Sequence, residues 1–300
     1  MKSFTIIFCI LIIIISSCTT TRTVKKPESG SISVEKYLGP KKKLAVARFE
    51  NATRFGQRRL GENITAVLST ELNKTNRFIL LEREHVDKIL EQIALSQSGF
   101  TEGNLEQVAL LDADFILAGA VTHYAVKTTG SKNIFSQSKT QTAEVKADVR
   151  IINSRTGEIL LSETGSGKVE KEFSKVLGMG KSGGYDESLE MDAFRAAVID
   201  VTENIIHAID SRPWICDVVE IAAEGLYIDA GQQSNLMIGD SLDIYFRGES
   251  VKNLSGTIIG YKEKMCAIGV VTKYFGENGA LITPDSYQDL QLPLICKIHD

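Results

Sequence analysis

Apolar residues recur along this chain in blocks whose period changes between about two and 3.6, which predicts alternating strands and helices. In residues 58–73, for example, Leu60, Ile64 and Leu68 share one helical face. The predicted strands are Lys43–Phe49, Phe78–Leu81, Asp114–Val121, Ala143–Asn153 and Glu158–Ser162. The predicted helices are Arg58–Asn73, Glu82–Ser96, Asn104–Leu111 and Leu189–Asp210. This order predicts an α/β (α+β) domain over residues 43–211, with a mixed sheet and flanking helices.

From Trp214 onward the pattern changes to short apolar runs that are separated by glycines and lack helical spacing. The predicted strands are Val218–Ile221, Leu226–Asp229, Ser241–Phe246, Gly256–Gly260, Ile268–Phe275 and Ala280–Thr283. Short strands with frequent turns are typical of small barrels. Residues 212–300 are therefore predicted to form a separate small all-β domain, an SH3-like barrel.

The first 17 residues have the pattern of a targeting segment. Lys2 supplies a positive charge, and residues 4–15 are an almost uninterrupted apolar run. A membrane-spanning helix needs about 20 apolar residues, so this shorter run predicts a secretory signal peptide over residues 1–17. Ile15-Ser16-Ser17-Cys18 resembles the lipobox of bacterial lipoproteins, which implies cleavage before Cys18 and attachment of diacylglycerol and palmitate to it. An ordinary signal peptide with an incidental Cys18 is the alternative.

Residues 18–42 are polar and cannot bury enough apolar surface to fold, which predicts a hydrated tether. Contact between its lysines and anionic headgroups is the alternative. By resemblance to lipoproteins of Gram-negative bacteria, Thr19 after the acylated residue favours the outer membrane, because an Asp there commonly retains a lipoprotein at the inner membrane. The expected location is the periplasmic face of the outer membrane.

The composition excludes several classes of protein. The 300 residues include 34 Lys or Arg and 38 Asp or Glu, so the net charge is −4, whereas a nucleic-acid-binding surface is basic. The four histidines are not spaced as metal ligands, and no catalytic triad is present. Gly180-Lys181-Ser182 lacks the first glycine of a phosphate-binding loop, because that position is Lys175. We predict no enzyme activity, no metal and no cofactor.

Four segments resemble, in the same order, the CsgG family, which comprises the lipoproteins of the curli secretion channel. They are Leu44–Asn51, Phe78–Arg83, Ala113–Gly119 and Val149–Ile159. The resemblance implies a periplasmic α/β domain that packs into a homo-oligomeric ring. It also implies two hairpins per subunit that join an outer-membrane barrel, and a loop near the first helix that narrows the channel.

Each part of such a channel has an expected place in the sequence. The narrowing loop should lie between the first strand and the first helix, where Asn51 and Phe55 are the candidates for lining a channel. A simple strand-to-helix loop is the alternative. The hairpins should lie at residues 124–148 and 163–190, but neither range has the apolar alternation that a membrane strand of about 9–11 residues needs. We therefore predict soluble loops in both ranges.

The C-terminal part resembles the barrel of the flagellar assembly protein FlgT in Gly225–Asp229 and Ile238–Leu242. The resemblance implies a barrel suited to protein docking, and a domain that only stabilises the fold is the alternative. Three cysteines, Cys216, Cys266 and Cys296, also lie here. In an oxidising periplasm Cys216 could pair with Cys266 or Cys296, and three unpaired thiols are the alternative.

These expectations combine into one predicted function. The chain is expected to act in the assembly or transport of envelope or secreted proteins, through ring formation and docking of other envelope proteins at the outer membrane. A pore-forming subunit of a curli-like secretion channel is the alternative.

Overall fold

The computed structural model describes residues 37–56, 58–81, 113–132, 136–176, 187–254, 256 and 258–299. Within these ranges the first part of the chain forms a mixed sheet with strand order β3-β1-β4-β5-β6, and β2 pairs with β4. The strands are β1 (Lys42–Val46), β2 (Glu50–Asn51), β3 (Phe78–Leu81), β4 (Phe115–Lys132), β5 (Ser136–Asn153) and β6 (Ile159–Val176). β1 is parallel to β3 and β4, whereas β5 is antiparallel to β4 and β6. The predicted mixed sheet is confirmed.

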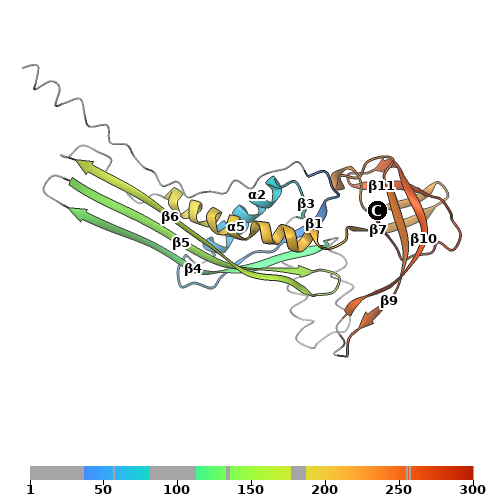
Figure 1. Ribbon diagram of the computed structural model, residues 1–300, viewed down its shortest axis with the longest axis horizontal. Helices are drawn as coiled ribbons and strands as arrows, with labels where there is room; N and C mark the ends of the chain where they lie inside the picture. The colour runs from blue at the N-terminus through green and yellow to red at the C-terminus, as the bar shows by residue number, and fades with distance from the viewer. Residues whose placement is uncertain are drawn as a thin grey trace, which may run out of the picture.

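Two helices cover one face of this sheet (Figure 1). Helix α2 (Arg59–Lys74) and helix α5 (Glu187–Asp210) are the amphipathic segments that the sequence predicted, with ends that differ by one or two residues. Helix α5 packs against β5, β6 and α2. Leu68 of α2, Phe194 of α5 and Val145 of β5 belong to one buried core. The flanking helices are thus positioned by the apolar face that their sequence pattern defined.

The largest difference from the prediction concerns β4, β5 and β6, which are each 18 residues long. The prediction of soluble loops at residues 124–148 and 163–190 is wrong for the described residues, because β4 pairs with β5 over its whole length and β6 continues to Val176. Figure 1 shows that the three strands project together beyond the start of α5.

These strands carry a buried apolar row only near the helices, as at Ala143 and Val145 of β5, and elsewhere many of their cross-strand pairs are polar. Thr129 lies opposite Thr140, and Glu144 lies opposite Lys168. Threonine favours strands, and pairs of hydroxyls or of opposite charges contribute to sheet stability. A search for alternating apolar residues therefore missed the polar parts of these strands.

The C-terminal part forms a closed barrel with strand order β10-β11-β8-β7-β12-β9. Its elements are β7 (Ile215–Ala222), β8 (Gly225–Ile228), the short 3-10 helix η3 (Gln232–Ser234), β9 (Ser241–Lys252), β10 (Ile258–Phe275), β11 (Gly279–Pro284) and β12 (Leu294–Ile298). Its buried side chains, such as Trp214 and Leu226, form a core separate from that of the sheet. The prediction of a small barrel is confirmed.

Two strands of the barrel differ from the prediction. Residues 258–260 of the predicted strand Gly256–Gly260, and the whole of the predicted strand Ile268–Phe275, belong to the single strand β10, which follows β9 through three register shifts. Such irregularities bend a strand without ending it, so Gly260 does not end the strand. The five-residue strand β12 was not predicted, and it closes the barrel by pairing with both β7 and β9.

Several predictions lie outside the described residues. They are the signal peptide, Cys18, the helices Glu82–Ser96 and Asn104–Leu111, and the Gly180-Lys181-Ser182 segment. The predicted tether differs at its end, because β1 already begins at Lys42, which is buried. No helix in the described part of the chain has the length and apolar composition needed to cross a bilayer.

Candidate functional site

The segment that leads into β1 lies between the barrel and the sheet, at a contact region that we call the junction. Trp214 Nε1 donates a hydrogen bond to Lys41 O at 3.0 Å, and Lys41 N donates to Ser234 O at 3.0 Å, both on the barrel side. On the sheet side, Lys41 Nζ donates to Asn76 Oδ1 at 2.7 Å. Lys41, near the end of the predicted tether, is therefore bound to both parts of the molecule.

Lys42 is only 6% exposed. Its Nζ donates to Ile209 O at 2.7 Å and to Arg212 O at 2.5 Å, at the C-terminal end of α5. Carbonyl groups at this end of a helix lack partners within the helix and carry partial negative charge. Burial lowers the pKa of Lys42, and the charges of Asp210 and Asp114 oppose this effect. Lys42 thus fixes α5 against the start of β1.

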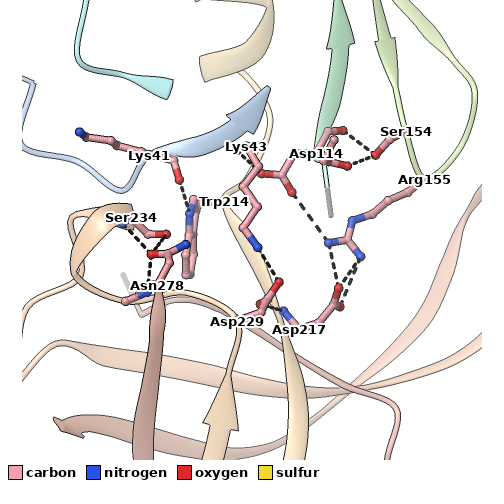
Figure 2. Close-up of polar contacts among 12 residues, drawn as sticks. Lys41, Lys43, Asp114, Ser154, Arg155, Trp214, Asp217, Asp229, Ser234 and Asn278 are labelled. Atoms are coloured by element: carbon pink, nitrogen blue, oxygen red, sulfur yellow. Dashed lines mark hydrogen bonds and ion pairs between the residues drawn. The ribbon is translucent and has the colours of Figure 1, made fainter. Parts of the chain in front are cut away.

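Arg155 connects the sheet to the barrel (Figure 2). It lies in the turn between β5 and β6, and its guanidinium donates to both carboxylate oxygens of Asp217 on β7 at 3.2–3.3 Å. Its Nη2 also lies 3.8 Å from Asp114 Oδ1, next to β4. Asp217 binds a second guanidinium, that of Arg247 on β9, at 3.3 Å. A forked arginine–carboxylate pair fixes both distance and orientation, so these contacts set the angle between sheet and barrel.

A second ion pair crosses the junction beside the first. Lys43 Nζ lies 2.7 Å from Asp229 Oδ2, and Asp229 Oδ1 accepts a hydrogen bond from Asp217 N at 2.7 Å. Lys43 N donates to Asp114 Oδ2 at 2.8 Å. Three basic and three acidic side chains thus meet here: Lys43, Arg155, Arg247, Asp114, Asp217 and Asp229. Buried charges are tolerated when they are paired in this way.

Asp114 is the member of this cluster whose ionisation is most altered. Burial raises the pKa of Asp114 from 3.8 to about 6, although the hydrogen bond from Lys43 N and the charges of Arg155 and Lys43 lower it; the charge of Asp229 raises it further. The carboxyl group is therefore ionised at pH 7 and mostly protonated at pH 5. The junction changes its charge within this range.

Asn51 and Phe55, the candidates for lining a channel, lie in one compact loop. Asn51 Oδ1 accepts hydrogen bonds from Thr53 N at 3.0 Å and Thr53 Oγ1 at 2.7 Å, and Asn51 Nδ2 donates to Phe55 O at 2.5 Å. An Asn side chain that binds the backbone two residues later stabilises a turn. Asn51 therefore closes the loop, whereas the Phe55 side chain is 63% exposed. Their role in a channel stays a prediction.

The three cysteines of the barrel are free thiols in this structure. Cys216 on β7 and Cys296 on β12 are directly opposite each other, and both are buried. Cys266 lies on β10, is half-buried and donates to Lys264 O at 3.3 Å. The structure therefore brings two of the three predicted residues together and separates the third.

The junction was not predicted from the sequence. Asp114 directly precedes an apolar strand and Asp229 directly follows one, which was the available signal. The partner of Lys43, however, lies 186 positions later in the chain, and no local pattern encodes such a pair. Among the described residues, no group of three or more His, Cys, Asp and Glu is arranged to hold a metal ion.

Comparison with known proteins gives one family match. The family model described as "Curli production assembly/transport component CsgG" matches residues 29–227, which include all of the described sheet and end in β8. A protein of Neisseria meningitidis serogroup B, named "Putative lipoprotein", is 27% identical over 203 residues, which are 62% of this chain and 87% of that protein.

Two of the solved structures that match this chain have low sequence identities and low TM-scores. A hypothetical protein of Chlamydia trachomatis is 15% identical with a TM-score of 0.33, over 57% of this chain and 96% of that chain. A PelC dodecamer subunit of Paraburkholderia phytofirmans is 15% identical with a TM-score of 0.30, over 54% of this chain and 90% of that chain.

Proposed function

Because the chain belongs to the CsgG family, we propose that it is a lipid-anchored envelope protein that assembles with copies of itself and docks envelope or secreted proteins. In this proposal residues 1–17 are removed, and Cys18 carries the acyl anchor at the periplasmic face of the outer membrane. The family description and the lipoprotein name of the meningococcal relative support it.

The observation that carries the proposal is the projection of β4, β5 and β6 beyond the helical layer (Figure 1). We call residues 127–132, 136–142 and 170–176 the strand extension. Val169 is the last buried residue among the described side chains of β6, and the next three residues are exposed. At about 3.3 Å per residue, the seven residues that follow Val169 extend by about 20 Å. Among the described residues, no helix extends over this part of the sheet, and we infer that a surface of another molecule covers it.

Both outer strands of the extension offer an edge for pairing. Among the described strands, β6 pairs with β5 only, and β4 beyond Val121 also pairs with β5 only. Close to the helix, α5 covers the edge of β6, because Asp200 Oδ2 accepts a hydrogen bond from Ser166 N at 2.9 Å. A long strand edge is a ready template for a strand of another molecule. The extension is therefore the proposed assembly surface.

One row of the sheet carries opposite charges at its two edges. Lys127 on β4, Thr142 on β5 and Glu170 on β6 form one row across the sheet. Lys127 and Glu170 are both exposed. If the sheet continues from the β6 edge of one copy to the β4 edge of the next, Glu170 approaches the partner's Lys127. Opposite charges on neighbouring strands stabilise a pairing, and like charges destabilise it.

Charge reversal tests this arrangement. Lys127→Glu should reduce the yield of chemically cross-linked oligomers in membranes several-fold, and the double variant Lys127→Glu/Glu170→Lys should restore it. Lys146→Glu is the matched control, because Lys146 is exposed on the central strand β5 and lies at no edge. Equal yields of cross-linked oligomers from all four proteins would argue against the strand extension as the assembly surface. A wild-type protein that gives only monomers would also argue against it.

Membrane anchoring is tested separately through Cys18. Cys18→Ala should move the protein from the membrane fraction to the soluble periplasmic fraction, because acyl chains supply the affinity for the bilayer. Retention of the variant in the membrane would contradict an acyl anchor at this residue.

We assign partner docking to the barrel, which we propose to be an SH3-like domain over residues 212–300, beside an α/β domain over residues 43–211. Its exposed apolar side chains include Met237, Ile238 and Phe275, and exposed apolar surface commonly marks contact sites. Photo-cross-linking from position 237 should capture a protein partner in the envelope. Capture that is equally strong from the control position 249, an exposed glutamate, would oppose this assignment.

The alternative function is a pore-forming subunit of a secretion channel. The exposed ring of Phe55, on the loop that Asn51 closes, favours this alternative. Purified oligomers should then conduct ions in planar bilayers, and Phe55→Ala should raise the conductance. Well-formed oligomers that do not conduct would exclude the channel and leave the docking function.

A further inference from the structure

We infer that Cys216 and Cys296 form a disulfide that links the first strand of the barrel to its last strand, and that Cys266 takes no part in it. The inference rests on the proposed function for one point, the oxidising envelope compartment in which such bonds form.

The geometry of the two strands supports this pair. β7 and β12 are antiparallel, and Cys216 and Cys296 are register partners. Residues directly opposite each other point to the same face of a sheet, with Cβ atoms about 4.5–5.5 Å apart. A disulfide needs Cβ atoms about 3.5–4.5 Å apart. A shift of about 1 Å is therefore sufficient to close the bond.

The order of the strands excludes the third cysteine. In the closed barrel β10 has β9 and β11 as neighbours, so one strand separates it from β12 and two strands separate it from β7. Neighbouring strands are about 4.8 Å apart, so Cys266 on β10 is about 10 Å or more from either partner strand. This distance exceeds the Cα separation of about 7 Å that a disulfide tolerates.

The chemistry requires an external disulfide as oxidant. A thiolate of one cysteine attacks this disulfide and forms a mixed disulfide, which releases one thiol of the oxidant. The second cysteine then displaces the other half of the oxidant. In total, the two protein thiols give up two electrons and two protons, and the oxidant becomes two thiols.

Because both thiols are buried in the folded barrel, the disulfide forms during folding rather than after it. Cys216 is 3% exposed and Cys296 is 0% exposed, and both belong to the barrel core. Burial raises the pKa of the Cys216 thiol, which its neighbour Cys296 also raises, so the reactive thiolate is scarce in the folded barrel. An oxidant therefore reaches the pair only before β12 closes the barrel.

The bond would also support the junction. Asp217, which binds Arg155 and Arg247, is the residue after Cys216. The loop that the bond closes contains about 80 residues, and long closed loops restrict the unfolded chain most strongly. The oxidised barrel should melt higher than the reduced barrel by on the order of 10 °C.

The test is a disulfide map of the full chain. The purified protein is reduced, unfolded and refolded either in a buffer of oxidised and reduced glutathione or in excess dithiothreitol, and its free thiols are alkylated after denaturation. The glutathione sample should contain the peptide with Cys216 linked to the peptide with Cys296, and Cys266→Ser should keep this link. Complete alkylation of Cys216 and Cys296 in the glutathione sample, or a link to Cys266, would overturn the inference.

The same disulfide map on protein extracted from its membrane separates the proposed Cys216–Cys296 pairing from the proposed envelope location. A link between Cys216 and Cys296 there supports both the pairing and the envelope location. A link that forms in vitro but is absent in the extracted protein supports the pairing and contradicts the proposed location. Because the map is made on the wild type, a variant that fails to fold does not affect it.

Discussion

Lys42 is a buried cation whose partners are carbonyl groups at the end of a helix, 167 positions and more away in the chain. The sequence assigned it to a hydrated tether, because residues 18–42 have too few apolar side chains to fold on their own. At the residue scale, the assignment of Lys42 to the tether is wrong for a physical reason. A lysine at the start of a strand looks the same in the sequence whether or not a helix end lies beside it.

Replacement of Lys42 tests its contact with α5. Lys42→Met should lower the free energy of unfolding by about 1–3 kcal/mol, because it removes both hydrogen bonds from the Lys42 ammonium group to the end of α5. Urea denaturation measures this change. Lys41→Met is the control, because the contact of Lys41 Nζ with Asn76 is exposed, and it should change stability by less than about 0.5 kcal/mol. Equal effects of the two substitutions would contradict the assigned role.

Asp114 gives the junction a defined dependence on pH. The folded carboxyl group has a pKa of about 6 and the unfolded one about 3.8, so between these values the folded state binds more protons. Stability therefore falls as pH rises through this window, by about 3 kcal/mol in total. Asp114→Asn should remove this contribution, so that the stability of the variant relative to the wild type rises from pH 4 to pH 7.

Thermal or urea denaturation at several pH values measures this difference. Asp192→Asn is the control, because Asp192 is about half exposed on α5, and it should follow the pH profile of the wild type. A difference between Asp114→Asn and the wild type that does not change with pH would refute the role of Asp114.

At the scale of elements, the contact between β6 and α5 depends on two glycines. A Cβ atom at Gly167 would lie 2.0 Å from Ala193 O, and one at Gly165 would lie 2.3 Å from Ala197 O. The helix backbone thus touches the strand backbone, and no side chain fits between them. The sequence predicted α5 because its apolar residues follow a 3.6 period. It could not predict which glycines lie under the helix, because a glycine in a polar strand has the same local signature as a turn.

Gly167→Ala tests this close contact. The added methyl group forces α5 away from β6, so the free energy of unfolding should fall by about 1–3 kcal/mol. Gly130→Ala is the control in the same sheet, where the nearest atom to the new Cβ is Ser138 O at 3.5 Å. Its effect should stay within about 0.5 kcal/mol. Unfolding curves that coincide for the two variants would show that α5 is not packed so closely.

At the scale of the whole molecule, the two cores of this chain are joined by charged residues that the sequence could not pair. The family resemblance and the periodic segments predicted the sheet, the helices and the barrel. The junction and the strand extension were missed, because one depends on contacts between distant residues and the other on polar cross-strand pairs. The junction joins the sheet to the barrel, and the strand extension is the proposed assembly surface.

Arg155 tests whether the junction fixes the barrel to the sheet. Arg155→Met removes the forked contact with Asp217 and should increase the rate of protease cleavage between α5 and β7 several-fold, with both cores still folded. Lys262→Met is the control, because its ion pair with Glu249 lies in an exposed part of the β9–β10 hairpin. A cleavage rate that Arg155→Met leaves unchanged would mean that other contacts orient the barrel.

The central claim is that the chain assembles through its strand extension, and the mass of the complex extracted in a mild detergent tests it most directly. The measurement compares the wild type with a variant in which a two-residue turn replaces residues 127–142. The account predicts a large oligomer of one discrete mass for the wild type and a monomer for the variant. A wild-type monomer, or a variant that keeps the wild-type oligomer, would contradict it.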